Sequence, residues 1–260
     1  MTDRIYAARE AFRNKSILDT QLAHTSPVIS HSLHEPHRDF SLSDIILGGQ
    51  DGLVNVLGVI LGVAAASADV RLVQAAGLAA TFAESISMAA VAYTSSRAEQ
   101  EHYISELQRE QWEIEHYPEG EREEIRQIYI KRGFEGKLLE DVVKTITANK
   151  KTWIEVMMSE ELKLQPHTNG QSLRSAWIVG SSAVVGSLIP LLPFFILSVT
   201  SAIVISLLLS AMTLFGVGMY KGRITIGKQY RSGIELAVIG IVSALAGYAV
   251  GLFFKAPVVP

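Results

Sequence analysis

Long apolar segments alternate with short polar links along most of the chain. Five apolar segments, at 44–66, 73–93, 176–192, 194–217 and 234–254, are each long enough to cross a bilayer. At about 1.5 Å of rise per residue, a helix of this length spans about 30 Å of hydrocarbon. Segments of this length and number do not suit the core of a soluble protein. The pattern therefore predicts an all-α integral membrane protein with five transmembrane helices.

A polar block separates the second and third apolar segments and holds more than half of the acidic residues. It predicts three helices, over 95–116, 121–131 and 137–164, because YPEG and RGFEG are typical breaks. The expected domains are a mobile polar N-terminal arm (1–40), transmembrane helices one and two (41–95), a cytoplasmic three-helix metal-binding domain (96–168) and transmembrane helices three to five (169–260). The arm carries several histidines, and weak metal capture by them is the alternative to a solvated tail.

The basic residues of the links predict the orientation. The link between the fourth and fifth segments carries Lys221, Arg223, Lys228 and Arg231, whereas the links after the first and third carry only Arg71 between them. Because Lys and Arg are enriched in cytoplasmic loops, this link, the polar block and the N-terminus are expected in the cytoplasm. The compact chain favours a prokaryotic plasma membrane, with a vacuolar membrane as the alternative.

Composition narrows the chemistry. The 260 residues are 48% hydrophobic and 19% charged, and the net charge of −3 offers no basic surplus for nucleic acid. The mean hydropathy is +0.26. Cysteine is absent from the sequence, so a metal site has to use carboxylate, imidazole, thioether or backbone oxygen ligands.

The first apolar segment contains polar residues on one face. Asp51 and Asn55 are one helical turn apart, within an arc of roughly 120° that also holds four glycines, Gly48, Gly52, Gly58 and Gly62. An ionised aspartate within a span is costly and usually faces a partner or a water-filled path. The glycines allow another helix to approach closely. The pattern favours a cation or proton path, with a simple packing face as the alternative.

The second apolar segment offers a matching face. Glu84 and Met88 are one turn apart on it. A carboxylate with a thioether suits a transition metal better than Ca²⁺ or Mg²⁺. The predicted transport path therefore consists of Asp51, Asn55, Glu84 and Met88.

An acidic stripe marks the first helix of the polar block, where four glutamates and a histidine share an arc of about 80°. Like charges at i, i+4 destabilise a helix, so a cation is expected to compensate. The third helix adds paired methionines and glutamates. Together they predict a metal cage from Glu99, His102, Glu106, Glu110, Glu113, Met157, Met158, Glu160 and Glu161. A solvated acidic helix pair is the alternative.

Five motifs, in this order and spacing, resemble the vacuolar iron transporter family over residues 40–255: DIILGGQDGL, AGLAATFAESISMAA, EQEHY, WIEVMMSEEL and GSLIPLLPFF. The resemblance implies a dimer of five-span subunits that exports Fe²⁺, often also Mn²⁺, from the cytoplasm in exchange for protons. The path would lie between the first spans of the two subunits. Asp51 and Met88 match path residues of the family, and the matching metal-collecting positions are Glu99, Glu110, Glu113, Met157, Met158 and Glu161.

Two positions depart from the family pattern. Ala80 stands where many members carry a glutamate, and Glu84, one turn later on the same face, is expected to substitute. His102 stands where a glutamate is common, and imidazole still binds Fe²⁺ or Zn²⁺.

The sequence thus predicts a transporter rather than an enzyme, with no permanently bound cofactor. The expected cargo is Fe²⁺, or Mn²⁺, Zn²⁺ or Co²⁺. The expected partners are protons, membrane lipid and a second copy through the first span, and no nucleic acid. A di-iron ferroxidase built on Glu99-x-x-His102 and Glu113-x-x-His116 is one alternative. A metal buffer or sensor without flux is the other.

Overall fold

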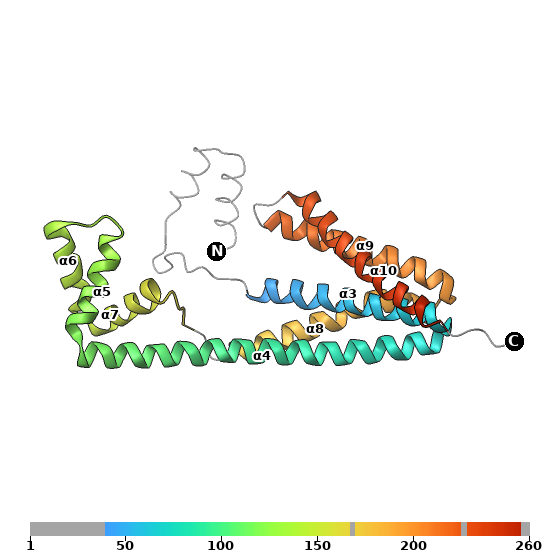
Figure 1. Ribbon diagram of the computed structural model, residues 1–260, viewed down its shortest axis with the longest axis horizontal. Helices are drawn as coiled ribbons and strands as arrows, with labels where there is room; N and C mark the ends of the chain where they lie inside the picture. The colour runs from blue at the N-terminus through green and yellow to red at the C-terminus, as the bar shows by residue number, and fades with distance from the viewer. Residues whose placement is uncertain (1–39, 167–169, 225–227, 256–260) are drawn as a thin grey trace, which may run out of the picture. The chain divides into compact units, whose positions relative to one another are not determined.

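The computed structural model describes residues 40–166, 170–224 and 228–255, all in helices and short links (Figure 1). Apart from its last residue, the predicted N-terminal arm lies outside these ranges. The long helices are α3 (Phe40–Ser67), α4 (Val70–His116), α8 (Gln171–Leu191), α9 (Val199–Ile224) and α10 (Gln229–Phe253). Each is long and apolar enough to cross a membrane, which confirms the five predicted spans.

Helix α4 is one uninterrupted helix of 47 residues, or about 70 Å. Only its first half is apolar, so its second half continues beyond a bilayer into the polar block, as the sequence predicts. The tight link from α3 holds Ala68 at a positive φ of 53°. The Asp69 carboxylate then caps α4 by accepting a hydrogen bond from the Arg71 N–H at 2.8 Å.

Proline ends α8 as predicted, but the fourth span begins later than predicted. A 3₁₀ turn, η2 (Leu192–Phe195), follows α8, and α9 starts only at Val199. The Ser206 hydroxyl donates to the Pro190 carbonyl at the end of α8 at 2.7 Å, and the Gln74 amide donates to the Phe194 carbonyl of η2 at 2.8 Å. Pro193 has no N–H to continue an α-helix, which explains the shift.

Helix α3 packs against α8, α10 and α4, and its apolar side forms the core of the membrane region. Its glycines contact neighbouring backbone directly. A Cβ on Gly52 would overlap the Ala183 carbonyl of α8, and a Cβ on Gly251 of α10 would overlap the Gly62 carbonyl. The predicted close approach of another helix is therefore made within the chain, and the glycine spacing is no sign of a second copy.

The polar block has its own small apolar core beside the end of α4. The polar block contains α5 (Pro118–Ile130), α6 (Gly136–Thr147), α7 (Lys150–Val156) and a π-helix, η1 (Met157–Glu161). Ile114, Ile125, Val143 and Trp153 are among the buried residues that pack together.

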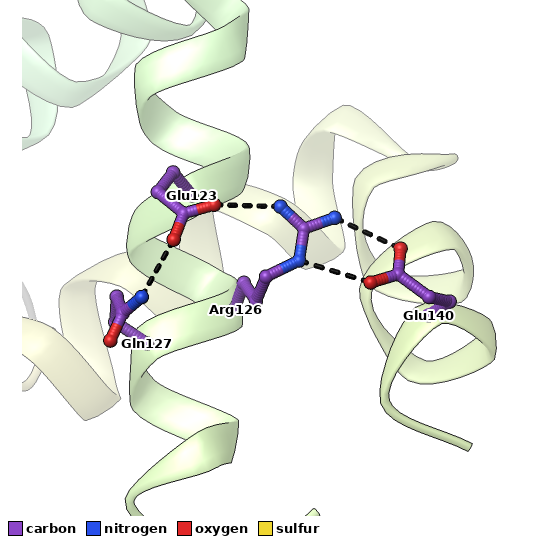
Figure 2. A network of polar contacts seen from close by, with 4 residues as sticks. All are labelled: Glu123, Arg126, Gln127 and Glu140. Carbon is purple, nitrogen blue, oxygen red and sulfur yellow. Dashed lines mark hydrogen bonds and ion pairs between the residues drawn. The ribbon is translucent and has the colours of Figure 1, made fainter. Parts of the chain in front are cut away.

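Ion pairs join α5 to α6. Arg126 donates to Glu123 at 2.7 Å and to both carboxylate oxygens of Glu140 at 2.9 and 3.1 Å, and Gln127 donates to Glu123 at 2.6 Å (Figure 2). The bidentate contact is a geometrically specific link between the two helices.

The prediction of three helices in this block is wrong, because the expected helix at 137–164 is broken. Helix α6 ends at Thr147, and α7 begins at Lys150. The Asn149 side chain accepts hydrogen bonds from the N–H groups of Lys151 and Thr152 and so caps α7. Asparagine favours such caps over helix interiors.

Candidate transport path and metal-binding cluster

The two predicted polar faces of the membrane region meet between α3 and α4. The Asn55 amide donates a hydrogen bond to the Glu84 carboxylate at 2.6 Å. The Asp51 carboxyl group also interacts with that of Glu84. Met88 is half-buried one turn further along α4. The structure therefore brings together three of the four predicted path residues and places the fourth on the adjacent turn.

This polar group lies on the outer side of the described chain. Asp51 and Glu84 are half-buried and Asn55 is exposed. The opposite side of α3 carries fully buried side chains such as Leu53 and Val56. Charged groups within a span are costly when they face hydrocarbon. The arrangement is thus suited to an ion path or to contact with another protein surface.

A second cluster of carboxylates forms where α4 turns into α5. The YPEG turn folds the chain back, with the Tyr117 N–H donating to the Glu113 carbonyl at 2.7 Å. As a result Glu110, Glu113 and Glu121 each place one carboxylate oxygen within 4.8 Å of the others. Oxygen atoms at this separation can share one divalent cation.

Burial sets the electrostatics of this acidic cluster. Glu110 and Glu121 are only 1% and 4% exposed, and in each side chain Oε2 has no hydrogen-bond partner among the described residues. Burial, together with repulsion from Glu124 and Glu110, raises the pKa of Glu121 to about 8. Carboxylates in this state hold protons near neutral pH unless a metal ion replaces them.

Two further carboxylates lie beside the cluster. Burial and then repulsion from Glu124 raise the pKa of Glu161 to about 7. Within the cluster, burial also raises the pKa of Glu110, and the positive charge of Arg109 partly offsets this rise. Glu124 and Glu161 also line a cavity of about 490 Å³ between α5 and η1. The cluster thus has two further carboxylates beside it.

The structure brings some of the predicted cage residues into the acidic cluster and places others elsewhere. Glu110 and Glu113 are members of it, and Glu161 borders it. Glu160 is instead ion-paired with Arg132. The Glu106 carboxylate pairs with Arg109 at 2.8 Å, and the His102 ring nitrogen lies 3.9 Å from the Glu106 carboxylate. Glu99 is exposed about 16 Å along the helix from Glu110.

The two methionines have different surroundings. Met157 is fully buried in the apolar core with Ile125 and Trp153. Met158 is 3% exposed and lies outside the described apolar clusters. Both belong to the π-helix η1, which contacts α4 and α5. Single π turns occur frequently at functional sites, because they re-aim side chains within a helix.

Sequence reasoning missed Glu121 and Glu124. The sequence predicts no site residue in the helix at 121–131, yet Glu121 stands one turn before the fully buried Ile125 and therefore shares its inward face. A carboxylate on the apolar face of a short helix was the available signal.

His116 is one of the two histidines of the alternative di-iron site, and it lies apart from the acidic cluster. Its ring stacks on Trp112 with centroids 4.4 Å apart, and its Nδ1 is 2.9 Å from the Trp112 carbonyl oxygen. The converging group of Glu110, Glu113 and Glu121 includes no histidine.

Comparisons with known proteins find related chains that match most of the length of this chain. A family model described as the VIT family matches residues 42–252. A protein of Oryza sativa subsp. japonica named vacuolar iron transporter 1 is 35% identical over 225 residues, which cover 84% of this chain and 89% of the relative. The Arabidopsis thaliana protein of that name is 34% identical, covering 79% and 82%. A Plasmodium falciparum vacuolar iron transporter is 28% identical and covers 95% of both chains.

Proposed function

Because the chain belongs to the VIT family, we propose that it transports iron across a membrane. The proposed cargo is Fe²⁺, with Mn²⁺ as a second cargo, and the proposed direction is out of the cytoplasm in exchange for protons. Zn²⁺ and Co²⁺ bind the same types of ligand and are further candidate cargoes. The metal is cargo, and the function needs no resident cofactor.

One observation carries the proposal: the same continuous helix, α4, bears both polar sites. Its apolar half holds Glu84 beside Asn55 and Asp51, and its polar end holds Glu110 and Glu113. The acidic cluster raises the local concentration of divalent cations through its field. Metal captured there is then available to the carboxylates of the path.

Exchange follows from the chemistry of those carboxylates. Asp51 and Glu84 hold either a partly dehydrated metal ion or protons, because protonation removes the negative charge that binds the metal. Metal and protons therefore compete for the same groups. This competition couples the flow of metal in one direction to the flow of protons in the other.

The position of the path supports a homodimer. Asn55 is exposed on α3, where lipid would leave its partner Glu84 poorly solvated. A second copy facing this side would enclose a polar path between the two first spans. Lipid would cover the apolar outward faces, such as Phe82 and Ile86 of α4.

The basic link between α9 and α10 supports a cytoplasmic position for the polar block. A prokaryotic plasma membrane is the proposed location. The names of the relatives support a vacuolar membrane as the alternative.

Metal uptake by proteoliposomes that contain a pH dye tests this function. Fe²⁺ uptake with opposite proton movement, lost in Asp51→Ala, is the expected result. Glu235→Gln is the matched control, because it removes an exposed carboxylate from another membrane helix, α10. Native flux in Asp51→Ala would rule out this path. Metal binding without flux would indicate a buffer, and stoichiometric O₂ consumption on adding Fe²⁺ would indicate a ferroxidase.

A further inference from the structure

A cation already occupies one side of the acidic cluster. The Arg109 guanidinium lies 2.9 Å from the Glu110 carboxylate and 2.8 Å from that of Glu106. Its Nε is 4.0 Å from the Glu113 carboxylate. Arg109 thus contacts two of the three residues whose oxygens converge.

Arg109 is placed at the solvent side of these carboxylates. Its side chain is 48% exposed, whereas that of Glu110 is 2% exposed. Arg109 pairs with Oε1 of Glu110, and Oε2 of Glu110 is the atom that has no hydrogen-bond partner among the described residues. Glu110 therefore offers one oxygen to a cation that belongs to the chain and keeps the other oxygen available.

The remaining charge in this region is mostly negative. Glu121 interacts with Glu124, Glu110 and Glu113, all of which disfavour its ionised form. Arg109 reduces this repulsion, since a guanidinium stays charged at every physiological pH and can donate to several carboxylates at once. Without it, the metal-free cluster would carry more uncompensated charge.

We propose that Arg109 is the built-in counter-cation of the acidic cluster, and that an arriving divalent metal ion competes with it for Glu110 and Glu113. The inference rests on the proposed capture of metal by this cluster. Two positive groups that share the same carboxylates weaken each other's binding. Arg109 therefore stabilises the metal-free state and lowers the affinity for metal, so that the cluster releases its cargo more readily toward the path.

Removal of the Arg109 charge should consequently tighten metal binding. A purely structural role predicts the opposite, because a disordered cluster binds metal more weakly. We would titrate Mn²⁺ into the full-length native protein and into Arg109→Gln by calorimetry in detergent. The expected result is an affinity about three- to tenfold higher in the variant, which is the scale of one partly screened charge.

Two variants control for general effects. Arg97→Gln removes the same charge from the same helix, where Arg97 pairs with Glu101 at 2.7 Å away from the cluster. It should leave the affinity within about twofold of native, because exposed ion pairs contribute little. Arg109→Lys keeps the charge and should stay near the native affinity.

Thermal unfolding supplies a second readout. Metal-free Arg109→Gln should unfold at a lower temperature than the native protein, and saturating Mn²⁺ should raise its unfolding temperature by more. An unchanged or weaker Mn²⁺ affinity in Arg109→Gln would overturn the counter-cation role.

The cluster itself is checked with the double variant Glu110→Gln/Glu121→Gln. Loss of one class of Mn²⁺ site in this variant supports capture by the cluster. If the double variant and the native protein give the same titration, the cluster does not capture metal, and both the proposed capture step and the role of Arg109 fail.

Discussion

Asn55 on α3 donates a hydrogen bond to Glu84 on α4, two residues 29 positions apart whose side-chain atoms lie 2.6 Å from each other. This contact joins the polar face of the first span to that of the second. It also fixes the carboxylate of Glu84 next to Asp51, where the proposed path requires it. We therefore propose that Glu84 takes the role of the glutamate that the family resemblance predicts at the position of Ala80.

Loss of the donor at position 55 should impair transport. Asn55→Ala leaves Glu84 without this hydrogen bond, and a hydrogen bond to a charged group is worth about 1.5–3 kcal/mol. We expect Fe²⁺ flux in proteoliposomes to fall about tenfold or more. Ser87→Ala, at an exposed position on α4 three residues after Glu84, is the control and should transport normally. Equal flux in Asn55→Ala and the control would show that the hydrogen bond has no role.

Substitutions in the acidic cluster of the polar block should weaken the capture of metal more than they lower the maximal flux. Glu110→Gln/Glu113→Gln removes two of the three converging carboxylates but leaves the membrane path intact. We expect the metal concentration for half-maximal flux to rise about tenfold or more, with a smaller change in maximal flux. Glu115→Gln, on the same helix but paired with Lys150, is the control. A fall in maximal flux alone would contradict a capture role.

The stability of the metal-free protein should depend on pH through Glu121. Its pKa is about 8 in the folded protein, above the ordinary value of 4.5, because of burial and neighbouring carboxylates. A group with a raised folded pKa contributes stability below the unfolded pKa, and this contribution is lost as pH rises through the folded pKa. The unfolding temperature in chelator should therefore fall between about pH 5 and pH 8.

Glu121→Gln should flatten this decline, and Mn²⁺ should raise the unfolding temperature of the native protein more at pH 8 than at pH 5. Thermal unfolding at several pH values provides the measurement. An equally steep decline in Glu121→Gln would assign the pH dependence to other groups.

The glycine contacts of the membrane region should control stability. Gly251→Ala places a Cβ against the Gly62 carbonyl, so we expect a loss of about 1–3 kcal/mol and a lower unfolding temperature in detergent. Gly216→Ala on α9 is the matched control, because a Cβ there meets no atom of the described residues within 4 Å. It should be neutral or slightly stabilising. Similar stability of the two variants would show that α3 and α10 can separate without cost.

Local patterns made the membrane region predictable. Length and hydropathy identify a span without knowledge of its neighbours, and the period of a helix places Asp51 and Asn55 on one face. The same reasoning found the acidic face of α4 and the proline end of α8. It failed where a local preference was overlooked, as at Asn149, which starts a new helix within an expected one.

Five spans, the acidic stripe of α4 and the polar face of each of the first two spans could be read from the sequence, since they depend on residue type and helical period alone. Which of these faces meet could be learned only from the folded chain. In the folded chain the glycines of α3 face α8 and α10, and Asn55 donates a hydrogen bond to Glu84. Glu121 of α5 lies next to Glu110 of α4. These contacts depend on how the chain folds back at a few turns, and a small change in a turn moves a distant side chain by many ångströms.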